Sequence, residues 1–245
     1  MQIASLIKTT LLDYPGFVAA TIFLSGCNFR CPFCHNSDLV TGNINDSNLI
    51  DEEEILAFLR KRKNVLAGVC ITGGEPTLQA DLADFIRRVK ELGYLVKLDT
   101  NGYKPEVLES LLIEGLLDYI AMDVKNCKGK YHLTCGFGNT QLENNIAANY
   151  SHKNFSICNI EKSVELIKNS GISHEFRTTV VKEFHTGEDL IEIGKWLSGS
   201  DWYLQLFEDN DKVLEKGYTS YSDTEINTIC EVLQTREYTV KIRGA

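Results

Sequence analysis

The stretch VAATIFLSGCNFRCPFC, residues 18–34, joins an apolar run to three closely spaced cysteines. Val18–Leu24 is rich in β-branched and aromatic residues, which is typical of a buried strand. Cys27, Cys31 and Cys34 follow it, in the loop where that strand should end. Because the chain opens without the basic segment of a secretion signal, disulfides are not the expected use of these thiols. The cysteine cluster therefore needs a metal or redox explanation.

Strands and helices are expected to alternate along the rest of the chain. Six further runs have the composition of strands: Val65–Ile71, Leu95–Asp99, Tyr119–Asp123, His174–Val181, Trp202–Phe207 and Tyr238–Ile242. Helical windows accompany them: Asp51–Arg62, Leu78–Leu92, Pro105–Gly115, Ile160–Ser170, Gly187–Leu197 and Asp223–Gln234. In the second window, apolar residues recur every three or four positions and predict one buried face: Leu82, Phe85, Ile86 and Val89. This alternation indicates a parallel sheet with crossover helices.

Unusual polar residues follow the ends of several of these strands. Gly73-Gly74-Glu75-Pro76 comes after the second strand, Asp99-Thr100-Asn101-Gly102 closes the third, and Met122-Asp123-Val124-Lys125 closes the fourth. A barrel gathers functional groups from the carboxyl ends of many strands, whereas a doubly wound sheet concentrates them at one switch point. Since about six βα units fall short of the usual eight, we expect an α/β fold, a partial (β/α)6 TIM-like barrel.

Composition and charge narrow the class of protein further. The chain has 245 residues, of which 43% are hydrophobic and 24% charged, and we expect one domain spanning residues 1–245. Its formal net charge of −9 argues against a nucleic-acid partner. Its apolar runs are too short to cross a membrane, so a cytoplasmic protein is expected. The polar segment 126–159 is expected to be a long loop or an insertion that carries some helix.

The cysteine loop allows two kinds of metal chemistry. A structural zinc site needs four ligands; no second Cys-x-x-Cys pair follows, so His35 would have to complete it. Three thiolates can instead hold three irons of a 4Fe–4S cluster, which leaves the fourth iron open to a small molecule. We favour the cluster. A non-catalytic adaptor protein with structural zinc is the alternative from a different class.

The Cys-x-x-x-Cys-x-x-Cys run, with aromatic Phe33 before the last cysteine, resembles the signature of the radical S-adenosylmethionine (SAM) enzymes. Gly73-Gly74-Glu75-Pro76 is similar to a second motif of that family, and the resemblance extends over roughly Leu6–Val181. It implies a barrel of the radical SAM type with one 4Fe–4S cluster on Cys27, Cys31 and Cys34, and SAM bound to the open iron. Reductive cleavage of SAM then gives a 5′-deoxyadenosyl radical. No further catalytic side chain is implied.

The resemblance also implies which residues contact SAM: Phe33, Cys34, His35, Gly73, Gly74, Glu75, Asp99, Thr100, Asp123, Lys125 and Arg177. Glu75 would accept from the methionyl ammonium of SAM or brace its turn, and His35 would donate to cluster sulfur, contact adenine or cap its loop. Asp123 and Lys125 face the same side of a strand, so a simple ion pair is their alternative. Arg177 would approach the SAM carboxylate or face solvent.

The remaining cysteines and histidines carry no recognised ligand pattern. Cys70 and Cys230 fall on apolar faces and should behave as small hydrophobic side chains. Three cysteines share the segment 126–159: Cys127, Cys135 and Cys158. An auxiliary cluster on them is the less favoured interpretation, because their spacing matches no ferredoxin pattern. Surface or packing positions are expected for the other histidines: His132, His152, His174 and His185.

Leu12-Asp13-Tyr14-Pro15-Gly16 and the run from Ser25 to Asn36 are most similar to the activating proteins of anaerobic ribonucleoside-triphosphate reductases, a branch of the glycyl-radical activating enzymes. This resemblance implies a hydrogen abstraction from a backbone glycine of such a reductase. It also implies a flavodoxin- or ferredoxin-like electron donor and, in some members, a monovalent cation. Gln205 departs from the histidine found in activating enzymes of pyruvate formate-lyase, although an activator of that or another glycyl-radical enzyme remains an alternative.

Overall fold

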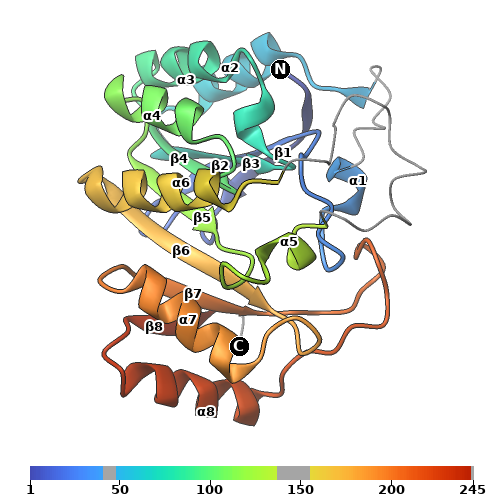
Figure 1. The fold of residues 1–245 in the computed structure, drawn as a ribbon. Coiled ribbons are helices and arrows are strands. Elements are labelled where there is room, and N and C mark those ends of the chain that lie inside the picture. The colour runs from blue at the N-terminus through green and yellow to red at the C-terminus, as the bar shows by residue number, and fades with distance from the viewer. Residues whose placement is uncertain (41–47, 137–154, 244–245) are drawn as a thin grey trace.

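The computed structural model describes residues 1–40, 48–136 and 155–243. Within these residues, eight strands form one sheet: β1 (Ile3–Thr10), β2 (Ala19–Leu24), β3 (Gly68–Gly73), β4 (Leu95–Thr100), β5 (Tyr119–Asp123), β6 (Ser173–Val180), β7 (Trp202–Leu206) and β8 (Val240–Arg243). The α-helices of the same residues are α1 (Ser37–Val40), α2 (Glu52–Arg62), α3 (Leu82–Glu91), α4 (Pro105–Ile113), α5 (Tyr131–Thr134), α6 (Ile157–Asn169), α7 (Gly187–Leu197) and α8 (Asp223–Gln234). Figure 1 shows the longer helices arranged along one face of the curved sheet.

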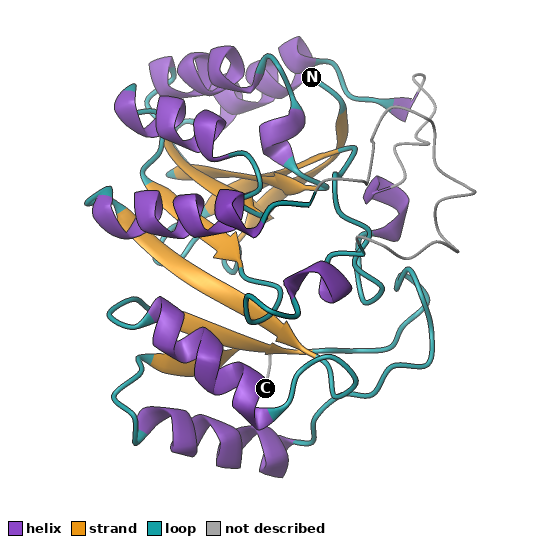
Figure 2. Cartoon of the chain, viewed as in Figure 1, coloured by secondary structure: helices purple, strands orange, loops and turns teal. Residues whose placement is uncertain are grey.

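The strands follow one another in chain order across the sheet, from β1 to β8. β2 to β8 are all parallel, and the crossover helices between them lie outside the strands, as Figure 2 shows. Among the described residues β8 pairs only with β7, and β1 pairs only with β2 and Ile50, so the sheet does not close on itself. The expected partial barrel with an open side is confirmed.

The first strand was not predicted from the sequence. β1 runs antiparallel to β2, with Ile3 opposite Leu24. It lies at the edge of the sheet, and most of its residues are exposed or half-buried. A strand of this kind needs no strict alternation of apolar residues, and Leu6 and Ile7 are in fact adjacent. The seven predicted strands are confirmed with bounds that differ by at most three residues, and β5 has the predicted bounds.

The helix predicted over Leu78–Leu92 begins four residues later, at Leu82. Pro76 opens a separate 3-10 helix, Pro76–Leu78, because its fixed φ and missing N–H suit a first helical position. The chain turns before α3 begins. The predicted apolar face of α3 is confirmed, since all four of its residues are buried: Leu82, Phe85, Ile86 and Val89.

The segment 126–159 is described only in part. It contains the short helix α5, in agreement with the expectation of some helix in this segment, and the start of α6, which begins at Ile157 rather than at Ile160. Residues 137–154, including His152, lie outside the described residues.

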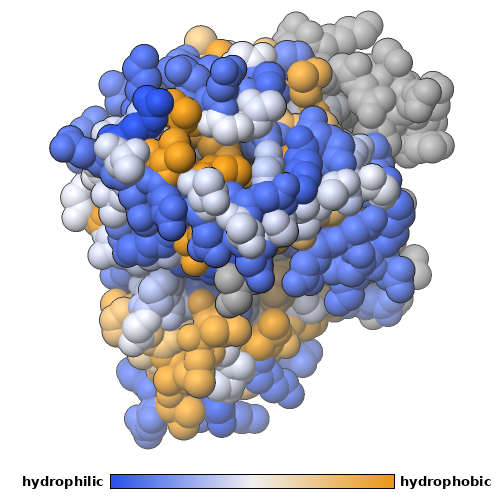
Figure 3. All heavy atoms as spheres, turned by 90° about the horizontal axis from the view of Figure 1, so that it is seen from below, coloured by the Kyte–Doolittle hydropathy of each residue, from blue (hydrophilic) through white to orange (hydrophobic). Residues whose placement is uncertain are grey.

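Two further features of the fold are the length of its helices and the distribution of hydrophobic side chains on its surface. No helix among the described residues is long and apolar enough to cross a membrane. Figure 3 shows a mainly hydrophilic surface on which hydrophobic side chains gather in separate areas, the larger of them in the lower part of the view. Leu11 and Leu12, in the turn between β1 and β2, are among the most exposed large aliphatic side chains of the described residues, at 74% and 88% exposure.

Candidate functional site

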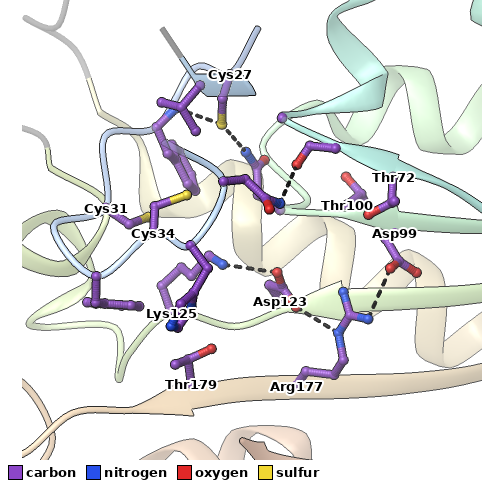
Figure 4. Close-up of a pocket in the computed structure, with 18 of the residues that line it drawn as sticks. Cys27, Cys31, Cys34, Thr72, Asp99, Thr100, Asp123, Lys125, Arg177 and Thr179 are labelled. Atoms are coloured by element: carbon purple, nitrogen blue, oxygen red, sulfur yellow. Dashed lines mark hydrogen bonds and ion pairs between the residues drawn. The ribbon is translucent and has the colours of Figure 1, made fainter. Parts of the chain in front are cut away.

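A cavity of about 280 Å³ lies at the carboxyl ends of strands β2 to β7. Figure 4 shows side chains from the cysteine loop and from β3, β4, β5 and β6 around it. Twelve of the thirteen residues predicted to hold a cluster or SAM line this cavity: Cys27, Cys31, Phe33, Cys34, His35, Gly73, Gly74, Asp99, Thr100, Asp123, Lys125 and Arg177. The carboxyl ends of parallel strands meet at one edge of the sheet, which explains why residues so distant in sequence come together.

The cysteine loop, residues 27–34, is fixed by its aromatic and basic side chains. Phe29 and Phe33 are buried in the core; the ring of Phe29 packs against Tyr103, and that of Phe33 against Phe184. The guanidinium of Arg30 donates to the carbonyl oxygens of Cys27 at 2.6 Å and Phe29 at 2.8 Å. These contacts hold the loop so that the cysteines face the cavity.

The donors around the three thiols suit iron–sulfur ligation. The backbone N–H of Phe29 lies 3.3 Å from Cys27 Sγ, and the Asn101 side-chain amide lies 3.8 Å from the same sulfur. Such donors favour the thiolate, the form that binds metal. Burial acts in the opposite direction and raises the pKa of Cys27, Cys31 and Cys34, so a bound metal has to supply the compensating charge.

The geometry also bears on the kind of metal. Within the described ranges no three His, Cys, Asp or Glu side chains converge on one metal ion. A 4Fe–4S cluster does not require that convergence, because each thiolate binds a different iron. Two of the buried side-chain atoms without a hydrogen-bond partner among the described residues, Ser25 Oγ and Asn28 Nδ2, flank Cys27. The residues present therefore fit a 4Fe–4S cluster.

Gly73, the last residue of β3, and Gly74 lie very close to the backbone that leads into the cysteine loop. A Cβ on Gly74 would lie 2.0 Å from the carbonyl oxygen of Gly26, and one on Gly73 would lie 2.3 Å from the backbone of Leu24. The N–H groups of Gly74 and Glu75 donate to the carbonyls of Leu24 and Gly26, both at 2.8 Å. These backbone donors are therefore used to join β3 to the start of the cysteine loop.

Glu75 lies beneath the cavity and does not line its wall. Its side chain is fully buried, and its carboxylate accepts from the Thr77 hydroxyl at 2.6 Å, the Thr100 hydroxyl at 2.7 Å and the Asn101 backbone N–H at 2.6 Å. Burial outweighs these donors and raises its pKa. The arrangement favours the alternative in which Glu75 braces the ends of β3 and β4.

Five charged side chains form a ladder across β4, β5 and β6, which we call the charged ladder: Lys97, Asp99, Arg177, Asp123 and Lys125. Arg177 bridges two carboxylates, with Nε 2.8 Å from Asp123 and Nη1 3.1 Å from Asp99 (Figure 4). Lys125 Nζ lies 3.0 Å from Asp123, which confirms that these two side chains face the same way. Lys97 pairs with Asp99.

The charged ladder bears on three expectations from the sequence: the surroundings of Arg177, a monovalent cation, and the set of charged residues at the cavity. Burial alone would raise the pKa of Asp123, but Arg177 and Lys125 hold it well below its usual range. Arg177 is only 12% exposed and does not face solvent. Because the protein's own cations pair with both carboxylates, a monovalent cation on Asp99 and Asp123 gains no support from this arrangement. Lys97 was not predicted, although its position two residues before Asp99 places it on the same face of β4.

His185, expected at a surface or packing position, occupies a packing position behind the cavity. It is fully buried, and burial lowers its pKa. Its Nε2 lies 2.8 Å from the carbonyl oxygen of Lys125, and the backbone N–H of Val181 donates to its Nδ1 at 3.1 Å. A neutral ring with the proton on Nε2 satisfies both contacts. His185 therefore fixes the backbone of Lys125 at the end of β5.

His35 and Gln205 complete the cavity wall on the β7 side. The Nε2 of His35 lies 2.8 Å from the carbonyl oxygen of Glu208, and its ring packs on Phe207. His35 thus ties the cysteine loop to the segment after β7, which favours the capping role. Gln205 lines the cavity as expected for its position on β7.

The other cysteines have unlike surroundings. Cys70 and Cys230 are buried, which confirms the expected packing positions. In the segment 126–159, Cys127 lies 3.5 Å from Asp189 Oδ1, Cys135 is buried with its thiol 3.6 Å from the His132 carbonyl, and Cys158 is exposed. These surroundings give no support to an auxiliary cluster.

Comparison with known proteins agrees with the cofactors inferred from the residues that line the cavity. The model of the Radical SAM superfamily matches residues 21–197. A "Putative glycyl-radical enzyme activating enzyme" of Methanocaldococcus jannaschii is 33% identical over 213 residues, which make up 85% of this chain and 81% of the relative. These matches favour an enzyme over the zinc adaptor.

Solved structures share the fold at low identity. SuiB of Streptococcus suis bound to S-adenosylmethionine superposes with a TM-score of 0.62 at 17% identity, over 89% of this chain; this chain spans about half of SuiB, 48%. A radical SAM methyltransferase from Sphaerobacter thermophilus superposes with a TM-score of 0.64 at 15% identity, over 94% of this chain and 67% of the methyltransferase. The family model and the M. jannaschii relative, together with the cysteine loop and the open barrel, show that this chain belongs to the radical SAM superfamily of enzymes.

Proposed function

We propose that this protein is a radical SAM activase that forms a glycyl radical on a partner enzyme, an anaerobic ribonucleoside-triphosphate reductase. In the proposed reaction the Cα–H bond of a backbone glycine breaks, and the hydrogen atom joins C5′ of the 5′-deoxyadenosyl radical. The observation that supports it most is one cavity, in a barrel whose sheet does not close, that combines three cysteines with four side chains of the charged ladder. The M. jannaschii relative, similar over most of both chains, points to the same chemistry.

The residues of the cavity suit the two cofactors of the family. Cys27, Cys31 and Cys34 would hold three irons, and a flavodoxin- or ferredoxin-like protein would reduce the cluster. When bound and reduced, such a cluster supplies the electron that cleaves SAM into methionine and a 5′-deoxyadenosyl radical. The charged ladder has three cations and two carboxylates, so its one excess positive charge suits the SAM carboxylate at Lys125 and Arg177.

Replacing Lys125 by Ala should weaken SAM binding while the iron content stays normal. The loss of one charged hydrogen bond in a half-buried site costs roughly 1.5–3 kcal/mol, which is about a ten- to more than hundredfold rise in Kd. Neutralising Asp123 should also weaken SAM binding, because Lys125 and Arg177 both form ion pairs with its carboxylate. Equilibrium binding of SAM to the anaerobically reconstituted protein measures the effect.

Lys128→Ala is the matched control for this measurement. Lys128 lies three residues further along, and its ammonium pairs with Glu161 on the surface. It should bind SAM like the unsubstituted protein. An unchanged Kd in folded Lys125→Ala would mean that Lys125 only neutralises Asp123.

The open side of the barrel offers a path for a peptide substrate. Among the described residues β1 and β8 do not pair, so the cavity is not enclosed by a complete ring of strands. A radical aimed at a peptide Cα requires a residue without a side chain, and glycine meets that steric demand. An extended segment of a partner protein could reach the cavity from this side.

The proposal is tested by mixing the reduced protein and SAM anaerobically with candidate partners. An anaerobic ribonucleotide reductase should develop the doublet of a glycyl radical in its electron paramagnetic resonance (EPR) spectrum. Pyruvate formate-lyase under the same conditions should give much less. Both partners would present a glycine to the same cofactors, so a difference in radical yield would come from how well each partner docks on this protein.

The reductase itself provides the control. Replacing its C-terminal radical-bearing glycine by alanine should remove the doublet. A strong doublet on pyruvate formate-lyase and none on the reductase would transfer the assignment to the sister activase. Silence of every glycyl-radical enzyme, while small molecules consume the 5′-deoxyadenosyl radical stoichiometrically, would refute the activase.

A further inference from the structure

Lys97 is the only lysine among the described residues that is buried, with 2% exposure. Its ammonium pairs with Asp99, the only carboxylate that it contacts in the described ranges. Its other neighbours are uncharged: Cys70 Sγ at 3.8 Å and the ring of Tyr119, whose centroid is 5.9 Å away. Asp99 lines the cavity, whereas Lys97 lies behind the cavity wall. Burying an ammonium costs free energy even when it is paired, so this lysine is a candidate for a role beyond packing.

The charged ladder shares each of its carboxylates between two cations, with one oxygen for each cation. Asp99 accepts from Lys97 through Oδ1 and from Arg177 through Oδ2. Asp123 accepts from Arg177 through Oδ1 and from Lys125 through Oδ2 (Figure 4). The five side chains therefore form one row of alternating charges, in which Lys97 is the buried end and Lys125 is the end at the cavity.

This sharing of oxygens leaves part of the Arg177 guanidinium available. Its Nε and Nη1 donate to Asp123 and Asp99, and its Nη2 has no hydrogen-bond partner among the described residues. Arg177 lines the cavity, so these remaining N–H groups suit an anion bound there. A carboxylate with both oxygens free favours a bidentate pair with a guanidinium, and such a pair with Asp99 would occupy Nη2. Lys97 prevents it by occupying Oδ1 of Asp99.

Lys97 also sets the net charge of the charged ladder. Burial alone would raise the pKa of Asp99, but Arg177 and Lys97 lower it below its ordinary value, so the carboxylate is ionised at neutral pH. Three cations then face two carboxylates, which leaves one excess positive charge. Without Lys97, two cations would face two carboxylates, and the excess would be lost.

We propose that Lys97 is a positioning residue for SAM, which keeps the outer N–H groups of Arg177 free for the SAM carboxylate and supplies the excess positive charge of the charged ladder. Lys97 acts through Asp99 and Arg177 from behind the cavity wall. The inference rests on the proposed contact between the charged ladder and the SAM carboxylate, and it does not depend on the identity of the partner enzyme.

Lys97→Met tests this inference, because methionine is also unbranched and carries no charge. The variant should assemble its cluster with normal iron content. Its Kd for SAM should rise roughly three- to thirtyfold, the range for a residue that acts on a binding site through its neighbours. Equilibrium binding of SAM to the anaerobically reconstituted protein measures the effect. Lys97→Gln removes the same charge and should also raise the Kd, so it provides the test where the methionine variant does not fold.

The double variant Lys97→Met/Asp99→Asn separates positioning from packing. Asparagine removes one negative charge, which restores the excess positive charge, and its single acceptor oxygen cannot form a bidentate ion pair with Arg177. The Kd for SAM should therefore return to within about threefold of that of the unsubstituted protein. If Lys97 only packs, two damaging substitutions add. A double variant that binds SAM no better than Lys97→Met would overturn the proposal.

Lys90→Met is the matched control. Lys90 lies on α3 and also pairs with one carboxylate, that of Asp118 at 2.6 Å, but neither residue lines the cavity. Its variant should lose a little thermal stability and bind SAM like the unsubstituted protein.

Comparison with Lys125→Ala shows which statement fails if the expected rise is not seen. An unchanged Kd in folded Lys97→Met, beside a raised Kd in Lys125→Ala, would overturn the role of Lys97 alone. An unchanged Kd in both variants would overturn the role of Lys97 and also the proposed contact between the charged ladder and SAM.

Discussion

Replacing Cys31 by Ala should abolish the stable 4Fe–4S cluster and, with it, the cleavage of SAM. The cysteine loop offers three thiols to the cavity, and the cluster needs all of them as its protein ligands. The backbone N–H of Arg30 donates to the Cys135 carbonyl at 3.0 Å, so Cys135 lies beside the cysteine loop, and the double variant Cys31→Ala/Cys135→Ala removes a neighbouring thiol that could substitute. Iron and sulfide per chain, visible absorbance and yield of 5′-deoxyadenosine measure the loss.

Cys70→Ala and Cys230→Ala are the controls for the cluster. Both thiols are buried in packing positions, and Cys70 lies on β3 within the sheet. Their variants should keep the cluster and SAM cleavage largely intact, with only the modest instability of a small core truncation. Full cluster content in Cys31→Ala would refute the assignment of the three ligands.

Replacing Arg177 by Met should both destabilise the fold and weaken SAM binding. Arg177 is the shared partner of Asp99 and Asp123, and its removal takes one of two cationic partners from each of these half-buried carboxylates. The cost should be about 3 kcal/mol, the lower end for breaking a buried pair, since each carboxylate keeps one lysine. For a chain of this length that is a fall in Tm of roughly 6–12 °C.

Arg87→Met separates this effect from the loss of any arginine. Arg87 also contacts two carboxylates, Asp84 and Glu114, but the contacts lie on the protein surface. Surface ion pairs contribute little, so the Tm of this variant should stay close to that of the unsubstituted protein. Thermal unfolding of the apoprotein makes the comparison. Equal Tm values for both variants would mean that the charged ladder does not stabilise the fold.

The sequence predicts the features whose signals are local. Each parallel strand is a short apolar run, and period-two alternation correctly places Asp123 and Lys125 on one face. The cysteine loop and the polar strand ends are likewise contiguous in sequence, so most residues that line the cavity can be identified from the amino-acid sequence. Parallel topology then brings strand ends together, which accounts for the agreement at the cavity.

What could not be predicted depends on contacts between distant segments. Whether Glu75 faces a ligand or braces a turn is decided by Thr100 and Asn101, which lie on another strand and the turn after it. The role of His185 depends on the carbonyl of Lys125, sixty residues away. The edge strand β1 has only one neighbouring strand among the described residues, and its composition carries little signal. None of these contacts produces a recognisable pattern of residue spacing in the sequence.

The most direct test of the central claim follows the hydrogen atom itself. An anaerobic ribonucleotide reductase whose glycines carry deuterium at Cα is mixed with the reduced protein and SAM, and the 5′-deoxyadenosine formed is analysed by mass spectrometry. The account predicts that 5′-deoxyadenosine gains one deuterium in step with the growth of the glycyl radical signal. Unlabelled 5′-deoxyadenosine beside a full glycyl radical signal would contradict it.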